Sequence, residues 1–448
     1  MTSEQVNRPE AALALDDSQR TGSGVHEKPG IRSLAAYGLM AFPLAFVGLP
    51  IYLHAPDFYA VNFGQSLTTL GAVLLALRLF DAVQDPIIGS LSDRFHTRRK
   101  VVLALGALLL GAGFWMLFNP HMQSPLTWFA VSVLICTTGF SVVSINFQTL
   151  GGLWDTDRQD RTRVTASREA IGLVGLLVAS IVPTVLVAYL SPLAAFRWLT
   201  IAYIPLLALC FWILIRWLKT ARVREPHGVA SNRGWRDLLK DRWRVLFFSL
   251  VFLNTFASAI PAVLVLFFIR DRLGAESYTG LFLLIYFLAG AASMALWTRL
   301  AKSFGKFRTW QFSMATAILT FCWAALLQQG DIVAYAFVCL LSGLALGAEL
   351  ALPPAVLADH IDADHREQDA SRLFSLMAFL SKSGLAIATG LALPLLGWFG
   401  YQPGQPITPD LGFALSLTYA VLPCMFKLLA LGGLLVFEKD LARLKSSV

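Results

Sequence analysis

The chain has 448 residues, of which 56% are hydrophobic and 14% are charged. Soluble domains carry about 25% charged residues, so this composition excludes an ordinary soluble protein, and repeated apolar runs of about 20 residues indicate many membrane spans. The formal net charge of +8 does not predict nucleic-acid binding, because the basic residues gather in short loops between the apolar runs, where they set orientation.

The predicted order of segments is two similar halves between polar ends. Residues 1–32 lack the apolar core of a signal peptide and are expected to form a disordered cytoplasmic tail. An all-α membrane protein is expected, with six helices over 33–218, a cytoplasmic loop over 219–243, six helices over 244–437 and a cytoplasmic tail over 438–448. The twelve predicted spans centre on Met40, Leu75, Leu108, Leu134, Leu177, Leu206, Thr255, Tyr286, Ala317, Leu341, Leu385 and Val421.

Basic residues are concentrated in the loops on one side of these spans. The loops after spans two, four and eight and the central loop are basic, whereas the opposite loops, at about 54–65, 118–126, 328–331 and 399–411, contain no Lys or Arg. This asymmetry predicts a multi-pass protein of the cell inner membrane with both chain ends in the cytoplasm. Two bundles of six spans suggest a transporter that binds its solute near the membrane midplane and alternates access by rocking the halves.

Prolines fall inside many of the predicted spans. Each removes a backbone hydrogen bond and is expected to interrupt or hinge its helix. The prolines concerned are Pro43, Pro50, Pro86, Pro183, Pro261, Pro353, Pro354 and Pro394.

The second predicted span contains the sequence RLFDAVQDP, from Arg78 to Pro86. Asp81 and Asp85 are four residues apart and Arg78 lies three residues before Asp81, so a helix places all three on one face. A carboxylate at membrane depth costs on the order of 3 kcal/mol. Two interpretations stay open: an ion or proton site inside the bundle, or a structural Arg–Asp pair that joins helices.

Few other ionisable groups lie within apolar runs, and their charges are complementary. Two acids lie in the first half, whereas Lys382 lies in the second half with Glu349. We expect Lys382 to reach toward Asp81 or Asp85 and to neutralise them when no cation is bound; the alternative for Lys382 and for Glu349 is a purely structural pair. Lys427, near the predicted end of span twelve, is expected to extend to the membrane surface.

Short basic loops follow spans two and eight, at equivalent positions of the two halves. Such loops can pair with helix ends and act as a gate, or they can serve only to set topology, and both interpretations stay open. The residues assigned to a charge network or gate are Arg78, Asp93, Arg94, Arg158 and Asp359.

The sequence carries no enzyme signature. It has no phosphate-binding glycine loop with a lysine, no HExxH motif and no histidine cluster, and its five cysteines lack metal-ligand spacing. We therefore predict a protein that is not an enzyme and has no cofactor or metal beyond a coupling ion. An ion gradient, or the gradient of the solute itself, would drive it.

The sequence FDAVQDPIIG, residues 80–89, resembles the second-helix motif of the glycoside-pentoside-hexuronide:cation symporters. This melibiose permease group is a branch of the major facilitator superfamily. Further similarity in residues 155–161, 357–362 and 382–384 extends the resemblance over about residues 33–437. It implies the major facilitator fold and a site for a sodium ion or a proton. The residues that match the family's cation site are Asp81, Asp85 and Ser141.

The resemblance also implies a sugar site, which matches less well. The family's two sugar-binding carboxylates fall on Ala45 and Ser144, its stacking tryptophan falls on Gln148, and only its arginine remains, as Arg168. These losses favour a less hydroxylated, anionic or amphipathic substrate. The residues assigned to substrate binding are Ser144, Gln148, Arg168, Glu349 and Lys382.

The leading hypothesis is a secondary active transporter that couples a sodium ion or a proton to a small organic solute such as a sugar, glycoside or sugar acid. One alternative is a carrier of lysolipids or other amphipathic substrates, as in a related vertebrate branch. Another is a membrane scaffold or sensor without turnover. The expected partners are the solute and the lipid bilayer, not nucleic acid, and the chain is predicted to be a monomer.

Overall fold

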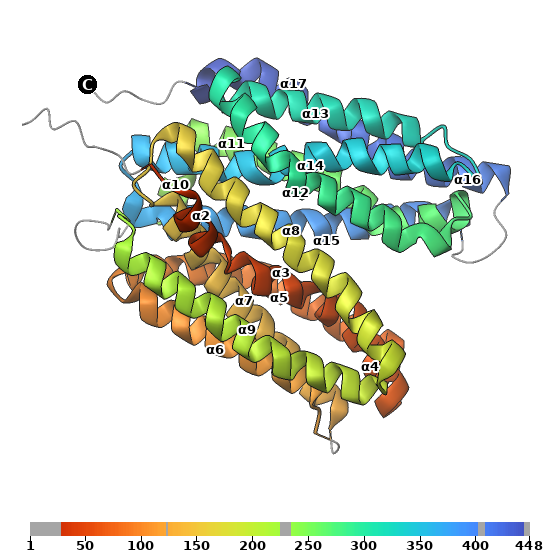
Figure 1. The fold of residues 1–448 in the computed structure, drawn as a ribbon. Coiled ribbons are helices and arrows are strands. Elements are labelled where there is room, and N and C mark those ends of the chain that lie inside the picture. Colours follow the sequence, from red (N-terminus) through yellow and green to blue (C-terminus); the bar gives the residue numbers. More distant parts are fainter. Residues whose placement is uncertain (1–27, 122–123, 225–233, 402–407, 443–448) are drawn as a thin grey trace, which may run out of the picture.

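The computed structural model describes residues 28–121, 124–224, 234–401 and 408–442, and these are almost entirely helical (Figure 1). The helices of the first half are α2 (Ile31–Gly38), α3 (Ala41–Leu49), α4 (Ala55–Phe63), α5 (Leu67–Arg94), α6 (Arg99–Phe118), α7 (Pro125–Gly152), α8 (Arg158–Tyr189) and α9 (Pro192–Thr220). Those of the second half are α10 (Trp235–Leu239), α11 (Arg242–Phe267), α12 (Thr279–Phe304), α13 (Lys306–Ala324), α14 (Ile332–Ala363), α15 (Ala370–Trp398), α16 (Pro409–Ser416) and α17 (Leu422–Ala442).

Eleven helical segments of the described residues are long and apolar enough to cross a membrane. The predicted ninth span, α13, is not among them; it has 19 residues and begins with Lys306 and Arg308 in its first turn. The class of fold is thus a helical membrane protein, and the count of twelve spans stays a prediction. The predicted tails lie largely outside the described residues, although α17 continues to Ala442, inside the predicted C-terminal tail. Of the predicted central loop, residues 219–224 and 234–243 are described, and they include α10.

Small residues allow close helix packing inside the first half. A Cβ added at Gly113 of α6 would lie 2.4 Å from the backbone nitrogen of Cys136 in α7, and one added at Gly139 of α7 would lie 2.3 Å from that of Leu110 in α6. Helices in membranes associate through such close backbone approach, because the lipid offers little hydrophobic driving force between them. The result is a first-half core separate from the two cores of the second half.

The two halves meet through α5, α7 and α8 on one side and α12, α14 and α15 on the other. In Figure 1 the two groups of helices converge near α2 and α10 and diverge toward α4 and α16. At the converging end Gly89 of α5 lies against Ser375, where an added Cβ would come within 2.1 Å of the hydroxyl oxygen. Only glycine allows α5 and α15 to approach this closely.

The prolines divide one span and leave the others continuous. The first span consists of α2, α3, a π-helical turn (η1, Pro50–His54) and α4. In contrast α5, α8, α11, α14 and α15 run uninterrupted through their prolines. The six prolines in these five helices therefore do not interrupt them, because the loss of one backbone hydrogen bond is tolerated in a packed membrane helix. That they hinge their helices stays a prediction.

Candidate cation and substrate sites

Lys382 of α15 meets the two carboxylates of α5. Its Nζ lies 2.8 Å from Oδ2 of Asp81 and 2.8 Å from Oδ2 of Asp85. It also donates to Oδ1 of Asp85 at 2.9 Å and to the hydroxyl of Ser141 at 2.8 Å. Asp81 is 5% exposed and Asp85 is fully buried. The structure thus brings together the predicted cation ligands and the lysine, and we name these four residues the interhalf cluster.

Neighbouring side chains fix the orientation of Asp81. Ser141 of α7 donates to its Oδ1 at 3.0 Å, and Gln84, one turn along α5, donates to the same oxygen at 2.8 Å. Thr138 of α7 in turn donates to the amide oxygen of Gln84 at 3.0 Å. Because these bonds come from two packed helices, the carboxylate is held in place before any ligand binds.

The interhalf cluster carries two carboxylates and one ammonium group, so its formal charge is −1 when all three are ionised. The ammonium lies where the oxygens of Asp81, Asp85 and Ser141 converge. Carboxylate and hydroxyl oxygens are the ligands of hard cations, so a cation that displaced Lys382 would find its ligands in place. A proton on either carboxylate would weaken the same contacts.

Arg78 does not join this cluster. Its guanidinium carbon lies 4.0 Å from the centre of the Tyr52 ring, in the π-helical turn of the first span. Within the described residues it forms no ion pair with Asp81. The expected Arg78–Asp81 contact is therefore replaced by a cation–π contact, which costs less desolvation than a buried ion pair.

A second polar group lies where α7 and α8 pack around Tyr37. Gln148 donates to the hydroxyl of Ser144 at 3.1 Å, and Tyr37 donates to the backbone oxygen of Phe147 at 3.1 Å. Arg168 lies beside the Tyr37 hydroxyl. Of the predicted substrate-binding residues, Ser144 and Gln148 are thus bonded to each other on α7, and Arg168 of α8 lies beside Tyr37.

Glu169 is a membrane-depth carboxylate that the sequence analysis missed. The Nε of Arg168 donates to its Oε1 at 2.9 Å, and Nη2 contacts the same oxygen. The sequence contained the signal, since Glu169 follows Arg168 directly, but a fifth span centred on Leu177 leaves both residues at its beginning. In the structure α8 begins ten residues earlier, at Arg158, so this pair lies well inside the helix.

Glu349 pairs with Lys427 instead of approaching Lys382. Nζ of Lys427 lies 2.5 Å from Oε1 of Glu349 and donates to the hydroxyl of Ser258 at 3.0 Å, and Ser258 donates to the other oxygen of Glu349 at 3.1 Å. We name Ser258, Glu349 and Lys427 the C-half cluster; it borders a cavity of about 50 Å³. The expectation that Lys427 reaches the membrane surface is wrong, because its span extends from 409 to 442 and places Lys427 near the middle.

Ion pairs and caps join the halves at the end where the helices converge. Arg161 of α8 donates to Asp359 at 3.2 Å and to Asp362 at 2.7 Å, both at the end of α14. Asp93 accepts hydrogen bonds of 2.9 Å from the backbone N–H groups of Ser371 and Arg372, in the first turn of α15. A carboxylate at a helix N-terminus is favourable for both hydrogen bonding and the helix dipole.

The other predicted gate residues differ in their placement. Arg158 lies 3.8 Å from Asp359, which also accepts a 2.6 Å bond from Lys306. Arg94 is exposed and forms no ion pair within the described part of the chain. Arg161, which the sequence analysis did not assign, is therefore the central arginine of this network.

The chain matches the family described as MFS/sugar transport protein over residues 34–439. It belongs to this family. As a member of the MFS/sugar transport proteins it is a transporter and not an enzyme, in agreement with the resemblance found in its second span.

Relatives of this family member include bacterial symporters that share its length. It is 24% identical over 377 residues to the inner membrane symporter YicJ of Escherichia coli, covering 79% of this chain and 80% of the relative. It is 23% identical over 423 residues to the putative glycoside/cation symporter YagG of the same organism, covering 86% and 87%. It is also 23% identical over 422 residues to the glucuronide carrier protein homolog of E. coli, covering 89% and 90%.

Solved transporters share the fold of this MFS protein. A bacterial homologue of the iron transporter ferroportin has a TM-score of 0.69 at 16% identity, covering 91% of this chain and 99% of its own. The fucose:proton symporter of E. coli has a TM-score of 0.61 at 14% identity, covering 89% and 97%. At these identities the likeness concerns the fold alone, which is that of a major facilitator.

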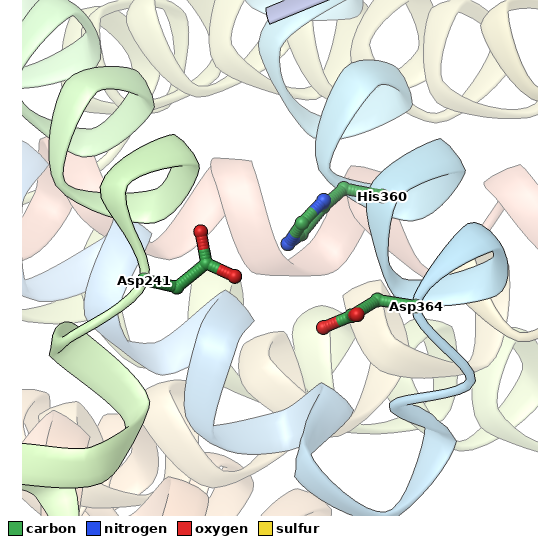
Figure 2. A group of neighbouring side chains, drawn as sticks. All are labelled: Asp241, His360 and Asp364. Carbon is green, nitrogen blue, oxygen red and sulfur yellow. The ribbon is translucent and has the colours of Figure 1, made fainter. Parts of the chain in front are cut away.

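A third group of ionisable side chains lies at the converging end of this transporter. Asp241, His360 and Asp364 point toward one another, with ligand atoms within 4.8 Å (Figure 2). Arg244 donates to Nε2 of His360 at 3.3 Å and to Asp364 at 2.5 Å, and Asp241 accepts from the backbone N–H of Trp243 at 2.8 Å. A guanidinium thus already supplies the positive charge that a metal ion would bring.

Proposed function

We propose that this transporter couples movement of a small polar solute to a sodium ion or a proton through the interhalf cluster. The observation that carries the proposal is the contact of Lys382, from the second half, with both carboxylates of the first half. The relatives support this interpretation, since YicJ is an inner membrane symporter and YagG a putative glycoside/cation symporter.

In the proposed mechanism Lys382 acts as a tethered substitute for the coupling cation. Without a cation, its ammonium offsets one of the two buried carboxylates, which otherwise cost several kcal/mol each in a low-dielectric environment. A cation that enters between Asp81, Asp85 and Ser141 takes over this neutralisation and releases Lys382. Binding therefore changes a link between the two halves and not only the occupancy of a site.

Coupling follows from that change. A ligand shifts a conformational equilibrium only by its different affinity for the two states. Cation binding removes the Lys382 link at mid-depth, and solute binding then favours the rearrangement of the halves. By the predicted orientation, the bonds from Arg161 and Asp93 close the cytoplasmic end, so they must break before the solute leaves toward the cytoplasm.

The proposed cargo is a sugar, glycoside or sugar acid, carried across the inner membrane. Two relatives favour this class, the putative glycoside/cation symporter YagG and the glucuronide carrier protein homolog. A lysolipid carrier is the second candidate, because the family carboxylates at Ala45 and Ser144 are absent and the chain is 21% identical over 412 residues to the human sodium-dependent lysophosphatidylcholine symporter 1. The Ser144–Gln148 pair and the Arg168 guanidinium are polar, and such groups favour a hydroxylated cargo over an acyl chain.

Uptake of candidate sugars into proteoliposomes with imposed sodium or proton gradients tests the proposal. We expect Asp81→Asn to lower gradient-driven uptake by about 100-fold or more, because the buried carboxylate that binds the cation is lost. Glu276→Gln, at an exposed carboxylate before α12, is the control and should leave uptake unchanged. Unaltered uptake with unaltered ion dependence in Asp81→Asn would show that the cation site is misplaced.

A further inference from the structure

One carboxylate oxygen of Glu169 is bonded to Arg168, and the other has no hydrogen-bond partner among the described residues. Both contacts from Arg168 fall on Oε1, and Oε2 accepts no hydrogen bond from the described part of the chain. The side chain of Glu169 is 25% exposed, whereas that of Arg168 is 7% exposed. A carboxylate oxygen without a partner at membrane depth is unfavourable unless water or a ligand bonds to it.

The position of Glu169 on α8 places its side chain between the two halves. Successive helical residues turn by about 100°, so Gly172 lies about 60° to one side of Glu169 and Leu173 about 40° to the other. Gly172 packs on the first-span residues Ala41 and Ala45. Leu173 belongs to the core shared with Met294 of α12 and with α14. Glu169 therefore lies on the strip of α8 that borders both halves.

The lipid-facing side of α8 lies on the opposite side of the helix from Glu169. Val174, Ile181 and Val185 are exposed apolar side chains, at 43%, 50% and 49%. They lie about 120–160° around the helix from Glu169, by the same rotation per residue. The partial exposure of Glu169 is thus exposure toward the region between the halves and not toward lipid.

We propose that Glu169 and Arg168 together bind the hydroxyl groups of the substrate. The carboxylate accepts hydrogen bonds from these hydroxyls, and the guanidinium donates hydrogen bonds to them. The inference rests on the proposed symport function and specifies its cargo as a neutral, polyhydroxylated solute. It also replaces the earlier expectation of a less hydroxylated, anionic or amphipathic substrate, which was based on the absence of acids at Ala45 and Ser144. An added Cβ at Gly172, one turn beyond Arg168, would lie 3.9 Å from the Cβ of Ala45, so α8 supplies a carboxylate close to where the first span lacks one.

The net charge of the Arg168–Glu169 pair determines which class of substrate it prefers. Arg168 and Glu169 are neutral together, so they attract neither a cation nor an anion strongly, while each offers hydrogen bonds to hydroxyls. A sugar acid would bring its carboxylate close to that of Glu169. An acyl chain would remove water from Oε2 without replacing its hydrogen bond. Neutral glycosides satisfy both groups, so they are preferred over both other classes.

Binding to the purified full-length protein tests the proposal by calorimetry. The probes are isoprimeverose and melibiose as neutral sugars, phenyl β-glucuronide as a sugar acid, and lysophosphatidylcholine. We expect a neutral sugar to bind the unaltered protein, and Glu169→Gln to weaken that binding by about 10- to 100-fold, since one hydrogen bond to a charged group is lost. The same change should leave glucuronide binding equal or tighter, because a like charge is removed; a merely structural role would weaken both probes equally.

Two controls separate the possible failures. Glu169→Asp should recover part of the neutral-sugar affinity, and thermal melting should show that both variants are folded. If a neutral sugar binds Glu169→Gln as tightly as the unaltered protein, the role of Glu169 is overturned while the symport proposal stands. If no neutral sugar binds the unaltered protein, the cargo assignment is overturned; if lysophosphatidylcholine alone binds, the proposed function is wrong about its substrate as well.

Discussion

Two buried clusters in this transporter are built from the same three chemical groups. Both the interhalf cluster and the C-half cluster combine carboxylate, a serine hydroxyl and a lysine ammonium. In each, the ammonium donates to the serine hydroxyl, at 2.8 Å for Lys382 and Ser141 and at 3.0 Å for Lys427 and Ser258. The similarity shows that this chemistry alone does not identify a coupling site.

The clusters differ in charge and in the helices that they connect. The interhalf cluster has two carboxylates, so its formal charge is −1 and one further cation is favourable. The C-half cluster has one carboxylate and is neutral, so a further cation gains little there. Lys382 joins α15 to α5, across the two halves, whereas Lys427 joins α17 to α14, within one half. Rocking of the halves therefore moves the helices joined by the first set of contacts relative to one another, and it can leave the second set unchanged.

Replacement of Lys382 by Met should give the largest functional effect. The empty carrier would then hold two uncompensated carboxylates, so its return across the membrane is blocked, whereas the carrier loaded with cation and solute still moves. We expect net gradient-driven uptake to fall by about 100-fold or more, because an uncompensated buried charge costs several kcal/mol, while exchange of labelled for unlabelled solute persists.

The matched control for this variant is Lys302→Met, at an exposed lysine of α12, which should leave both activities unchanged. Counterflow and net uptake are measured in the same proteoliposomes. A Lys382→Met protein that retains full net uptake would show that the ammonium is not needed to neutralise the empty site.

Replacement of Lys427 by Met should act on stability. The change leaves Glu349 buried without its partner, and breaking one side of a buried ion pair costs about 3–5 kcal/mol. The double variant Glu349→Gln with Lys427→Met removes both charges and should recover most of the lost stability. Thermal melting in detergent measures whether the single variant melts at a lower temperature than the double variant. Equal melting temperatures for the two would contradict a paired structural role.

Local sequence patterns predicted the interhalf cluster better than the C-half cluster, for physical reasons. Asp81 and Asp85 share a face by helix periodicity alone, and an isolated lysine in an apolar run needs a buried partner. The pairing of Glu349 with Lys427 was missed because Lys427 was placed near the end of its span, where a lysine can extend to the membrane surface.

The misplaced residues have similarly specific causes. Arg78 turns away from Asp81 because the π-helical turn at Pro50–His54 places the Tyr52 ring within its reach. Glu169 was missed because the start of its helix was placed too late in the sequence. Errors of a few residues at a helix end therefore decide whether a charge is assigned to the surface or to the membrane interior.

The serines of the two clusters offer the smallest and most discriminating comparison. Ser141→Ala removes one neutral ligand and one of the hydrogen bonds to Asp81, so we expect cation affinity to fall by about 5-fold, which corresponds to the roughly 1 kcal/mol of one net hydrogen bond. Ser258→Ala removes a bond to Glu349 and should lower the melting temperature slightly without changing cation affinity. Sodium titrations at fixed pH and melting curves on both variants measure these effects. A loss of cation affinity in Ser258→Ala equal to that in Ser141→Ala would mean that the neutral cluster also takes part in cation binding, and the distinction based on net charge would then fail.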